Sequence, residues 1–142
     1  MLNVKDVLYQ FSCSCVLQKD PSLCTYNGRG VTDLYHLTQK APQFMQGAEL
    51  ADKVVGKAAA ALIIKGGIIS VYADVISTPA LAMLRKAGIE TEYAQEVPFI
   101  ANRTRTGMCP LETLCEGEDA PELLYPIIGE FVRKMSEETE KQ

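Results

Sequence analysis

The sequence predicts an α/β domain of three layers, α/β/α, with helices on both faces of a mixed sheet of four to five strands. Segments with helical apolar spacing alternate with short runs rich in β-branched residues, in the order helix, hairpin, helix, strand, helix, strand, helix. Residues 68–76 are apolar on both faces, which is typical of a strand covered by helices. The unit from 68 to 97 is expected to form a right-handed parallel crossover.

Composition fits one globular domain over residues 1–142, with a charged tail from about residue 136 that is expected to fray. The net charge of -4 argues against nucleic acid as the main partner, because phosphate binding depends on Lys and Arg. The longest apolar run, 58–64, is too short to span a membrane. The odd number of cysteines and the absence of a secretory leader predict a reducing, cytoplasmic setting: Cys13, Cys15, Cys24, Cys109 and Cys115.

The N-terminal third predicts a capped helix followed by a hairpin. Asn3 precedes apolar residues at helical spacing and is a favoured N-cap. Residues 12–19 and 23–28 flank the turn signal Asp20-Pro21-Ser22, so they are expected to pair as a hairpin. Gly28-Arg29-Gly30 comes next. This run either cradles a phosphate or, more commonly for such a pair of glycines, forms a plain turn.

A central helix is predicted from roughly Ala48 to Lys65, ended by the left-handed stop Gly66-Gly67. After the buried strand, Ser77 or Thr78 caps a helix with Pro79 in its first turn. The remaining elements follow in order: a helix from Thr32 to before Pro42, an outer strand 90–97, a polar loop 98–108, a short helix from Cys109 and a last helix 121–138.

This order of elements resembles the cytidine-deaminase-like fold. In active deaminases a His or Cys followed by Ala-Glu opens one helix, Pro-Cys-x-x-Cys opens the next, and the three ligands hold a zinc ion. Here residues 50–54 are Leu-Ala-Asp-Lys-Val, and residues 78–83 are Thr-Pro-Ala-Leu-Ala-Met. Ala80 and Met83 stand at the cysteine positions. The sequence therefore predicts no metal and no cofactor, and excludes a zinc-dependent deaminase.

A closer resemblance is to the family known as domain of unknown function 1893, which belongs to this fold. It is carried by ADKVVGKAAA at 51–60, Asn102-Arg103, and GMCPLE at 107–112. The resemblance implies the fold, a cytosolic setting and self-association into a homo-oligomer. It implies no reaction, because the family has no assigned activity.

Two adjacent residues are candidates for chemistry near the sheet edge. If Asp52 and Lys53 lie in the first turn of the predicted 48–65 helix, Lys53 and the helix N–H groups bind a phosphate or carboxylate, and Asp52 orients Lys53 or accepts a proton. The alternative is that Asp52 is a favourable first-turn charge and Lys53 is solvated.

A second group of candidates lies in the 98–112 stretch. Cys109 stands at a predicted helix start behind Arg103 and Arg105, which favours a nucleophilic thiolate, although a buried structural cysteine is the commoner case. The predicted ligand contacts are Asn102, Arg103, Thr106, Gly107 and Glu112, the last as a capping carboxylate or an acid near the site. The alternative is an ordinary surface loop.

The leading hypothesis is a domain that binds a small anionic or nucleotide-like metabolite between the start of the 48–65 helix and the 101–112 loop. Its enzymatic form uses Cys109, Lys53 and Asp52. The rival hypothesis is a non-catalytic interaction or regulatory module that acts through a protein partner.

Overall fold

The computed structural model describes residues 3–28, 31–102 and 104–140. Five strands form one mixed sheet in the order β2-β1-β3-β4-β5. β1 is antiparallel to both of its neighbours, whereas β3, β4 and β5 are parallel. The strands are β1 Cys15–Lys19, β2 Ser22–Tyr26, β3 Glu49–Val55, β4 Ser70–Ser77 and β5 Glu90–Val97.

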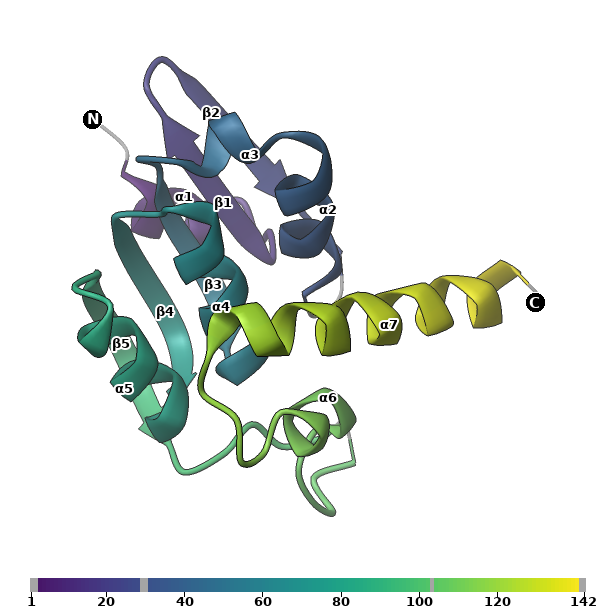
Figure 1. The fold of residues 1–142 in the computed structure, drawn as a ribbon. Coiled ribbons are helices and arrows are strands. Elements are labelled where there is room, and N and C mark those ends of the chain that lie inside the picture. Colours follow the sequence, from purple (N-terminus) through teal and green to yellow (C-terminus); the bar gives the residue numbers. More distant parts are fainter. Residues whose placement is uncertain (1–2, 29–30, 103, 141–142) are drawn as a thin grey trace.

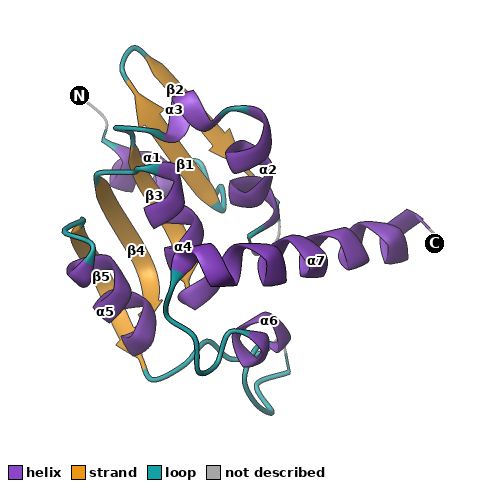
Figure 2. Cartoon of the chain, in the orientation of Figure 1, coloured by secondary structure: helices purple, strands orange, loops and turns teal. Residues whose placement is uncertain are grey.

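Helices lie on both faces of this sheet, which confirms the predicted three-layer α/β class. α2, α4, α5 and α7 cover one face and α1 packs on the other (Figures 1 and 2). The helices are α1 Val4–Gln10, α2 Thr32–Lys40, α3 Pro42–Met45, α4 Lys57–Gly66, α5 Thr78–Lys86, α6 Pro110–Leu114 and α7 Pro121–Glu140. None of these described helices combines the length and apolar character that a membrane span needs.

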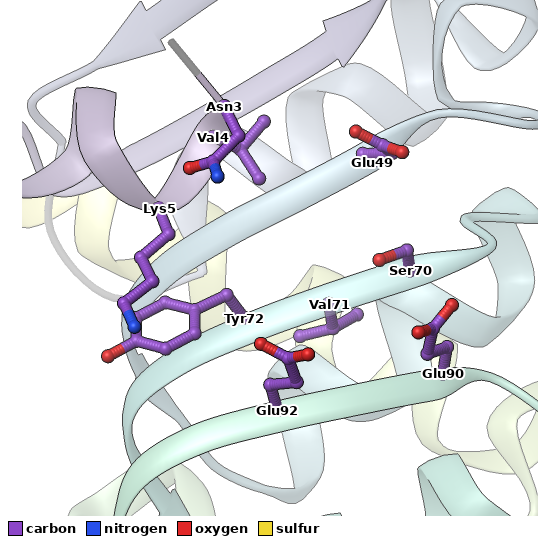
Figure 3. A pocket seen from close by; sticks show the side chains of 9 residues that line it. All are labelled: Asn3, Val4, Lys5, Glu49, Ser70, Val71, Tyr72, Glu90 and Glu92. Carbon is purple, nitrogen blue, oxygen red and sulfur yellow. The ribbon is translucent and has the colours of Figure 1, made fainter. Parts of the chain in front are cut away.

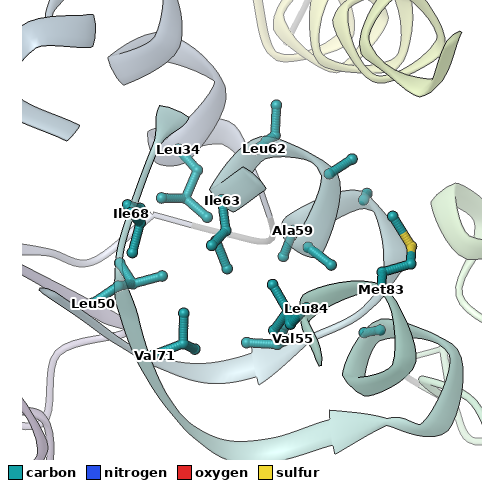
Figure 4. Packing of buried hydrophobic residues seen from close by; sticks show 14 of the residues in the cluster. Leu34, Leu50, Val55, Ala59, Leu62, Ile63, Ile68, Val71, Met83 and Leu84 are labelled. Atoms are coloured by element: carbon teal, nitrogen blue, oxygen red, sulfur yellow. The ribbon is translucent and has the colours of Figure 1, made fainter. Parts of the chain in front are cut away.

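The main core lies between α4 and the sheet (Figure 4). The four alanines at 58–61 are all buried, and small side chains let α4 approach its neighbours closely. Ile63 points toward Leu50 and Val71 of the sheet, whereas Leu62 points away from the sheet on the other side of α4 (Figure 4). A second, smaller cluster lies beneath α1: Val4, Val7, Leu8, Cys13, Val16, Ala51 and Tyr72.

The N-terminal predictions are confirmed. Asn3 caps α1 in a capping box, with the Asp6 N–H donating to Asn3 Oδ1 at 2.9 Å. β1 and β2 pair as the expected hairpin. Of the glycine-rich run, Arg29 and Gly30 lie outside the described residues. The N–H of Gly28 donates to Asp33 Oδ2 at 2.9 Å, so an internal carboxylate already holds that end of the run.

The predicted helix over 48–65 is wrong in its first half. Residues Glu49–Val55 form β3, the strand between β1 and β4, and α4 begins only at Lys57. The apolar residues of this stretch fit helical spacing, but β-branched Val54 and Val55 also suit a strand. β3 pairs with β1 on one side and β4 on the other, so its backbone groups form two rows of hydrogen bonds. These long-range hydrogen bonds favour the strand over the helix.

The ends of the other elements follow the local signals closely. Gly67 adopts a left-handed conformation with φ 77° and ends α4. Ser77 caps α5 by accepting from the Ala80 N–H at 3.2 Å. At the C-terminus, residues 136–140 continue α7 as helix, although the charged tail was expected to fray.

Candidate functional site

Polar residues gather at the edge of the sheet where β3 and β4 end. β3 ends at Val55, directly before α4, and β4 ends at Ser77, directly before α5. The carboxyl ends of parallel strands are the usual place for a ligand site in α/β folds. The segment from residue 98 to residue 120, which includes α6, passes along this edge (Figure 1). It comes from a later part of the chain, and α6 packs against α4.

Glu112, from α6, caps the amino end of α4. Its two carboxylate oxygens accept hydrogen bonds from the backbone N–H groups of Lys57 at 2.6 Å and Ala58 at 3.3 Å. The side chain is buried. Gly56 makes room for it, since a Cβ at this position would lie 2.2 Å from Glu112 Oε1. A carboxylate is therefore held where helix N–H groups and the helix dipole favour an anion. Glu112 therefore caps α4 and not the short helix to which it belongs.

Lys57 supplies a buried cation at the same end of α4. Its ammonium donates to the carbonyl oxygen of Cys115 at 3.0 Å and pairs with Asp119 Oδ1 at 2.8 Å. The Lys57 side chain is 10% exposed, whereas Asp119 is 79% exposed. The Lys57 ammonium lowers the pKa of the Asp119 carboxyl. Lys57 and Glu112 thus tie α4 to the 98–120 segment in both directions.

Two cysteines flank Glu112 on the same segment. Cys115 is fully buried, and burial raises the pKa of its thiol to about 11, with the Glu112 charge adding to the rise and Lys57 opposing it. Cys109 is the N-cap residue of α6 and is partly exposed. Its carbonyl oxygen accepts from the N–H and hydroxyl of Thr113. Of these two thiols, Cys109 is the one that a reagent can reach.

Asp52 and Lys53 lie on β3, not in the first turn of a helix. Asp52 is buried opposite Cys15 of β1, and Lys53 is exposed, as expected for neighbours that point to opposite faces of a strand. The predicted pairing of Lys53 with helix N–H groups is therefore wrong, and Lys57 occupies that position. A catalytic role for Asp52 or Lys53 stays a prediction.

Burial dominates the chemistry of Asp52. It raises the pKa of the carboxyl to about 7, and the charge of Asp33 adds to the rise. The N–H groups of Val54 and Lys53 oppose it, the Val54 contact to Oδ1 being 3.4 Å. Burial also raises the pKa of the neighbouring Cys15 thiol. Asp52 is thus an acid that exchanges its proton near neutral pH.

The predicted binding loop is organised by Asn102. Asn102 Oδ1 accepts from the Thr106 N–H at 3.0 Å, and Asn102 Nδ2 donates to Thr106 Oγ1 at 3.1 Å. The Asn102 N–H donates to the carbonyl of Gly107 at 2.9 Å. Arg103 lies outside the described residues. These contacts close the loop on itself, and ligand contacts by Asn102, Thr106, Gly107 and Glu112 stay a prediction.

A cavity of about 150 Å³ on the α1 face of the sheet was missed by sequence reasoning (Figure 3). Three strands and the start of α1 meet there, so no local motif marks it. The ammonium of Lys5 lies 5.0 Å from the ring centroid of Tyr72. The lining residues are Asn3, Val4, Lys5, Glu49, Ser70, Val71, Tyr72, Glu90 and Glu92. Within the described part of the chain, no three His, Cys, Asp or Glu side chains are grouped to hold a metal ion.

Sequence reasoning also missed Lys57, although a signal for it exists. Gly56-Lys57 follows two β-branched valines and precedes an alanine run, which is the pattern of a strand, a tight junction and a helix start. Glycine is an acceptable N-cap, so the helix start at Lys57 needed no Ser, Thr or Asp to mark it.

Fold and site together define an α/β domain in which a carboxylate from a distant segment caps the helix at the ends of the parallel strands. The chain belongs to the family described as Domain of unknown function (DUF1893), whose model matches residues 3–132. The resemblance carried by the 51–60 and 107–112 runs is confirmed.

Two solved structures from Thermotoga maritima are similar to the chain. A crystal structure of a DUF1893 family protein shares 27% identity, with a TM-score of 0.81, over 87% of this chain and 84% of that one. A diaminohydroxyphosphoribosylaminopyrimidine deaminase/5-amino-6-(5-phosphoribosylamino)uracil reductase gives a TM-score of 0.42 at 21% identity, over 57% of this chain and 29% of that one. No curated protein matches the chain.

Proposed function

We propose that this domain binds a small anionic metabolite at the amino end of α4, where a carboxylate or phosphate of the ligand takes the place of Glu112. The observation that carries the proposal is the Glu112 carboxylate itself, buried and bonded to the N–H groups of Lys57 and Ala58. The site is already shaped for an anionic group with two or more oxygens.

The surroundings support an exchange of Glu112 for a ligand. Gly56 leaves the space that a carboxylate or phosphate needs at the helix end, and Lys57 adds a positive charge there. Glu112 belongs to α6, a short helix of five residues outside the sheet, so replacing its carboxylate with a ligand anion leaves the pairing of the strands unchanged. Because Asp119 is exposed, solvent screens its ion pair with Lys57, and a ligand anion can take its place.

The 98–120 segment supplies the other proposed ligand contacts. Asn102, Thr106 and Gly107 would contact the ligand after the segment moves, and Cys109 at its partly exposed position would be the nucleophile if a reaction follows binding. A nucleotide-like ligand fits the combination of an anion site with a polar loop.

Substituting Cys109 with Ser should abolish turnover of any bound substrate and leave binding intact; unchanged turnover would remove Cys109 from the mechanism.

The direct test is a thermal-shift and calorimetry screen of the full chain with nucleotides, sugar phosphates and dicarboxylates. A true ligand stabilises the wild type, by about 2.7 kcal/mol at a hundredfold excess over Kd. It should bind Glu112→Ala at least tenfold more tightly, because the competing carboxylate is gone. Glu116→Ala, an exposed change on the same segment, serves as the matched control. If no anion distinguishes Glu112→Ala from Glu116→Ala, the proposal is wrong.

A second candidate function is an interaction module that self-associates or binds a protein partner. The observation in its favour is the carboxyl-terminal half of α7, which extends past the rest of the fold (Figure 1). A helix that projects in this way offers a surface to a second chain. Sedimentation equilibrium of the full chain tests it: a monomer at all concentrations argues against homo-oligomer formation.

A further inference from the structure

A groove of about 420 Å³ lies between α2, the carboxyl end of α4, and α7, away from the amino end of α4. It is an open groove on the surface and not an enclosed cavity. Neither the 98–120 segment nor the proposed anion site contributes to it. Its lining residues are Tyr35, Gln39, Lys65, Glu122, Tyr125 and Pro126.

The two tyrosines of this groove are held in fixed positions. Tyr35 and Tyr125 meet edge to face, with ring centroids 5.3 Å apart. The Tyr125 hydroxyl accepts from Gln39 Nε2 and lies 2.7 Å from Thr38 Oγ1. Since the Thr38 hydroxyl donates to the Tyr35 carbonyl, Tyr125 is the donor in its contact with Thr38. Hydrogen bonds thus fix Tyr125 before any ligand arrives.

The shape of α7 contributes to this arrangement. Gly129 lies beside the Tyr35 hydroxyl, and a Cβ there would be only 2.6 Å from the Tyr35 oxygen. Pro126, inside the helix, has no N–H to donate to the carbonyl of Glu122, so an acceptor is left at the groove. Both residues are unusual inside a helix; Gly129 lies against Tyr35, and Pro126 lines the groove.

A cation completes the groove. The Lys65 ammonium lies 4.6 Å from the centroid of the Tyr125 ring. Among the residues that the structure describes, no carboxylate lies within ion-pair distance of Lys65, even though Glu122 lines the same groove. An exposed ammonium over an aromatic ring is a weak contact that a ligand anion can exchange for an ion pair.

We propose that this groove binds a small planar aromatic ring that carries a carboxylate or a phosphate. The ring packs against Tyr35, Tyr125 and Pro126. The anionic group draws the Lys65 ammonium away from the Tyr125 ring and so frees the ring face for stacking. Gln39 and the Glu122 carbonyl offer polar contacts to ring substituents.

The test is a titration of the full chain followed by NMR of the tyrosine side chains. AMP and benzoate are the probes that combine ring and anion; adenosine, benzyl alcohol and inorganic phosphate each supply one half. The expected result is saturable shifts at Tyr35 and Tyr125, with AMP or benzoate binding at least tenfold more tightly than its halves. Tighter binding of AMP assigns a phosphate ligand, and tighter binding of benzoate assigns an aromatic carboxylate.

Two lysine variants decide whether the anion meets Lys65. Lys65→Gln should weaken the charged probe at least fivefold and should not weaken adenosine or benzyl alcohol, because it also uncovers the Tyr125 ring. Lys86→Gln, another exposed last-turn lysine, should change nothing. Equal effects of the two variants, or no saturable shift at the two tyrosines, would overturn the proposal. Glu112→Ala should leave binding in the groove unchanged, so failure here is separate from failure at the α4 site.

Discussion

The carboxylate of Glu112 lies 2.6 Å from the backbone nitrogen of Lys57, a residue 55 positions earlier in the chain. The side chain of Lys57 reaches back to the carbonyl oxygen of Cys115. Two buried charged residues therefore each satisfy backbone groups of the other's segment. This reciprocal contact positions the 98–120 segment over the ends of β3 and β4, and the stability of the site depends on it.

Removing the Glu112 carboxylate should destabilise the protein. Glu112→Ala leaves two buried helix N–H groups without partners, and we expect a loss of about 2–4 kcal/mol in the free energy of unfolding. Glu112→Gln keeps one acceptor oxygen and should lose roughly half as much. Urea denaturation at pH 7 measures both. Glu116→Ala should stay within about 0.5 kcal/mol of wild type; an equal effect for both alanine variants would contradict the capping role.

Gly56 and Glu112 should be energetically coupled. A Cβ at Gly56 would meet Glu112 Oε1, so Gly56→Ala forces the carboxylate off the α4 N–H groups. The backbone φ of Gly56 is -101°, which alanine adopts without strain. A double-mutant cycle should give a coupling of about 1–2 kcal/mol, since Gly56→Ala costs little once Glu112 is alanine. Strict additivity of the two changes would show that they do not meet.

The two lysines at 53 and 57 should behave differently. Lys57→Met removes a buried ammonium from the Cys115 carbonyl and should cost about 1–3 kcal/mol in denaturant unfolding. Lys53→Met, at an exposed strand position, should stay within about 0.5 kcal/mol. Asp119→Asn should also have a small effect, because the carboxylate is largely exposed. A larger loss for Lys53→Met than for Lys57→Met would contradict the conclusion that Lys57 is the buried lysine at the start of α4.

Asp52 should make stability depend on pH. The folded-state pKa of about 7 lies above the ordinary value of 3.8, so the unfolded chain releases this proton first and stability falls as pH rises from about 4 to about 7. Asp52→Asn stays neutral. Relative to wild type, the variant should gain stability between pH 4 and pH 8, by as much as about 4 kcal/mol.

The measurement for Asp52 is urea unfolding at several pH values between 4 and 8. Glu90→Gln, an exposed carboxylate on β5, is the control and should show no such trend. Asp33 and Cys15 are titratable neighbours of Asp52: in addition to burial, the charge of Asp33 raises the pKa of Asp52. Burial and the charge of Asp52 raise the pKa of the Cys15 thiol, so this thiol stays neutral between pH 4 and pH 8. A pH-independent difference between Asp52→Asn and wild type would show that the carboxyl is already ionised in the fold.

Local signals predicted most of the element ends. Asn3, Ser77 and Gly67 mark helix termini through their own side chain or backbone, so a stretch of a few residues suffices to place them. The 49–55 stretch failed because its apolar residues fit both helical and strand spacing. Only its neighbours β1 and β4, which come from before and after it in the chain, select the strand.

The candidate site was predicted in part for the same reason. Glu112 was considered as a capping carboxylate or an acid near the site, but its contact with the start of α4 was not foreseen. The central helix was predicted to start at about residue 48, so Lys53 was chosen over Lys57. A four-residue difference changes an exposed strand lysine into a buried one at a helix start. The groove of Tyr35 and Tyr125 joins two helices 90 residues apart and has no local pattern at all.

By itself the sequence determined the α/β class, the hairpin and the caps, because these depend on composition, spacing and short-range hydrogen bonds. The family followed from the resemblance of its 51–60 and 107–112 runs. The tertiary structure alone decided which backbone N–H groups meet Glu112, which lysine is buried, and that Asp52 lies inside the sheet. The physical reason is that burial and long-range hydrogen bonds depend on contacts between segments, and local periodicity carries no information about which segments meet.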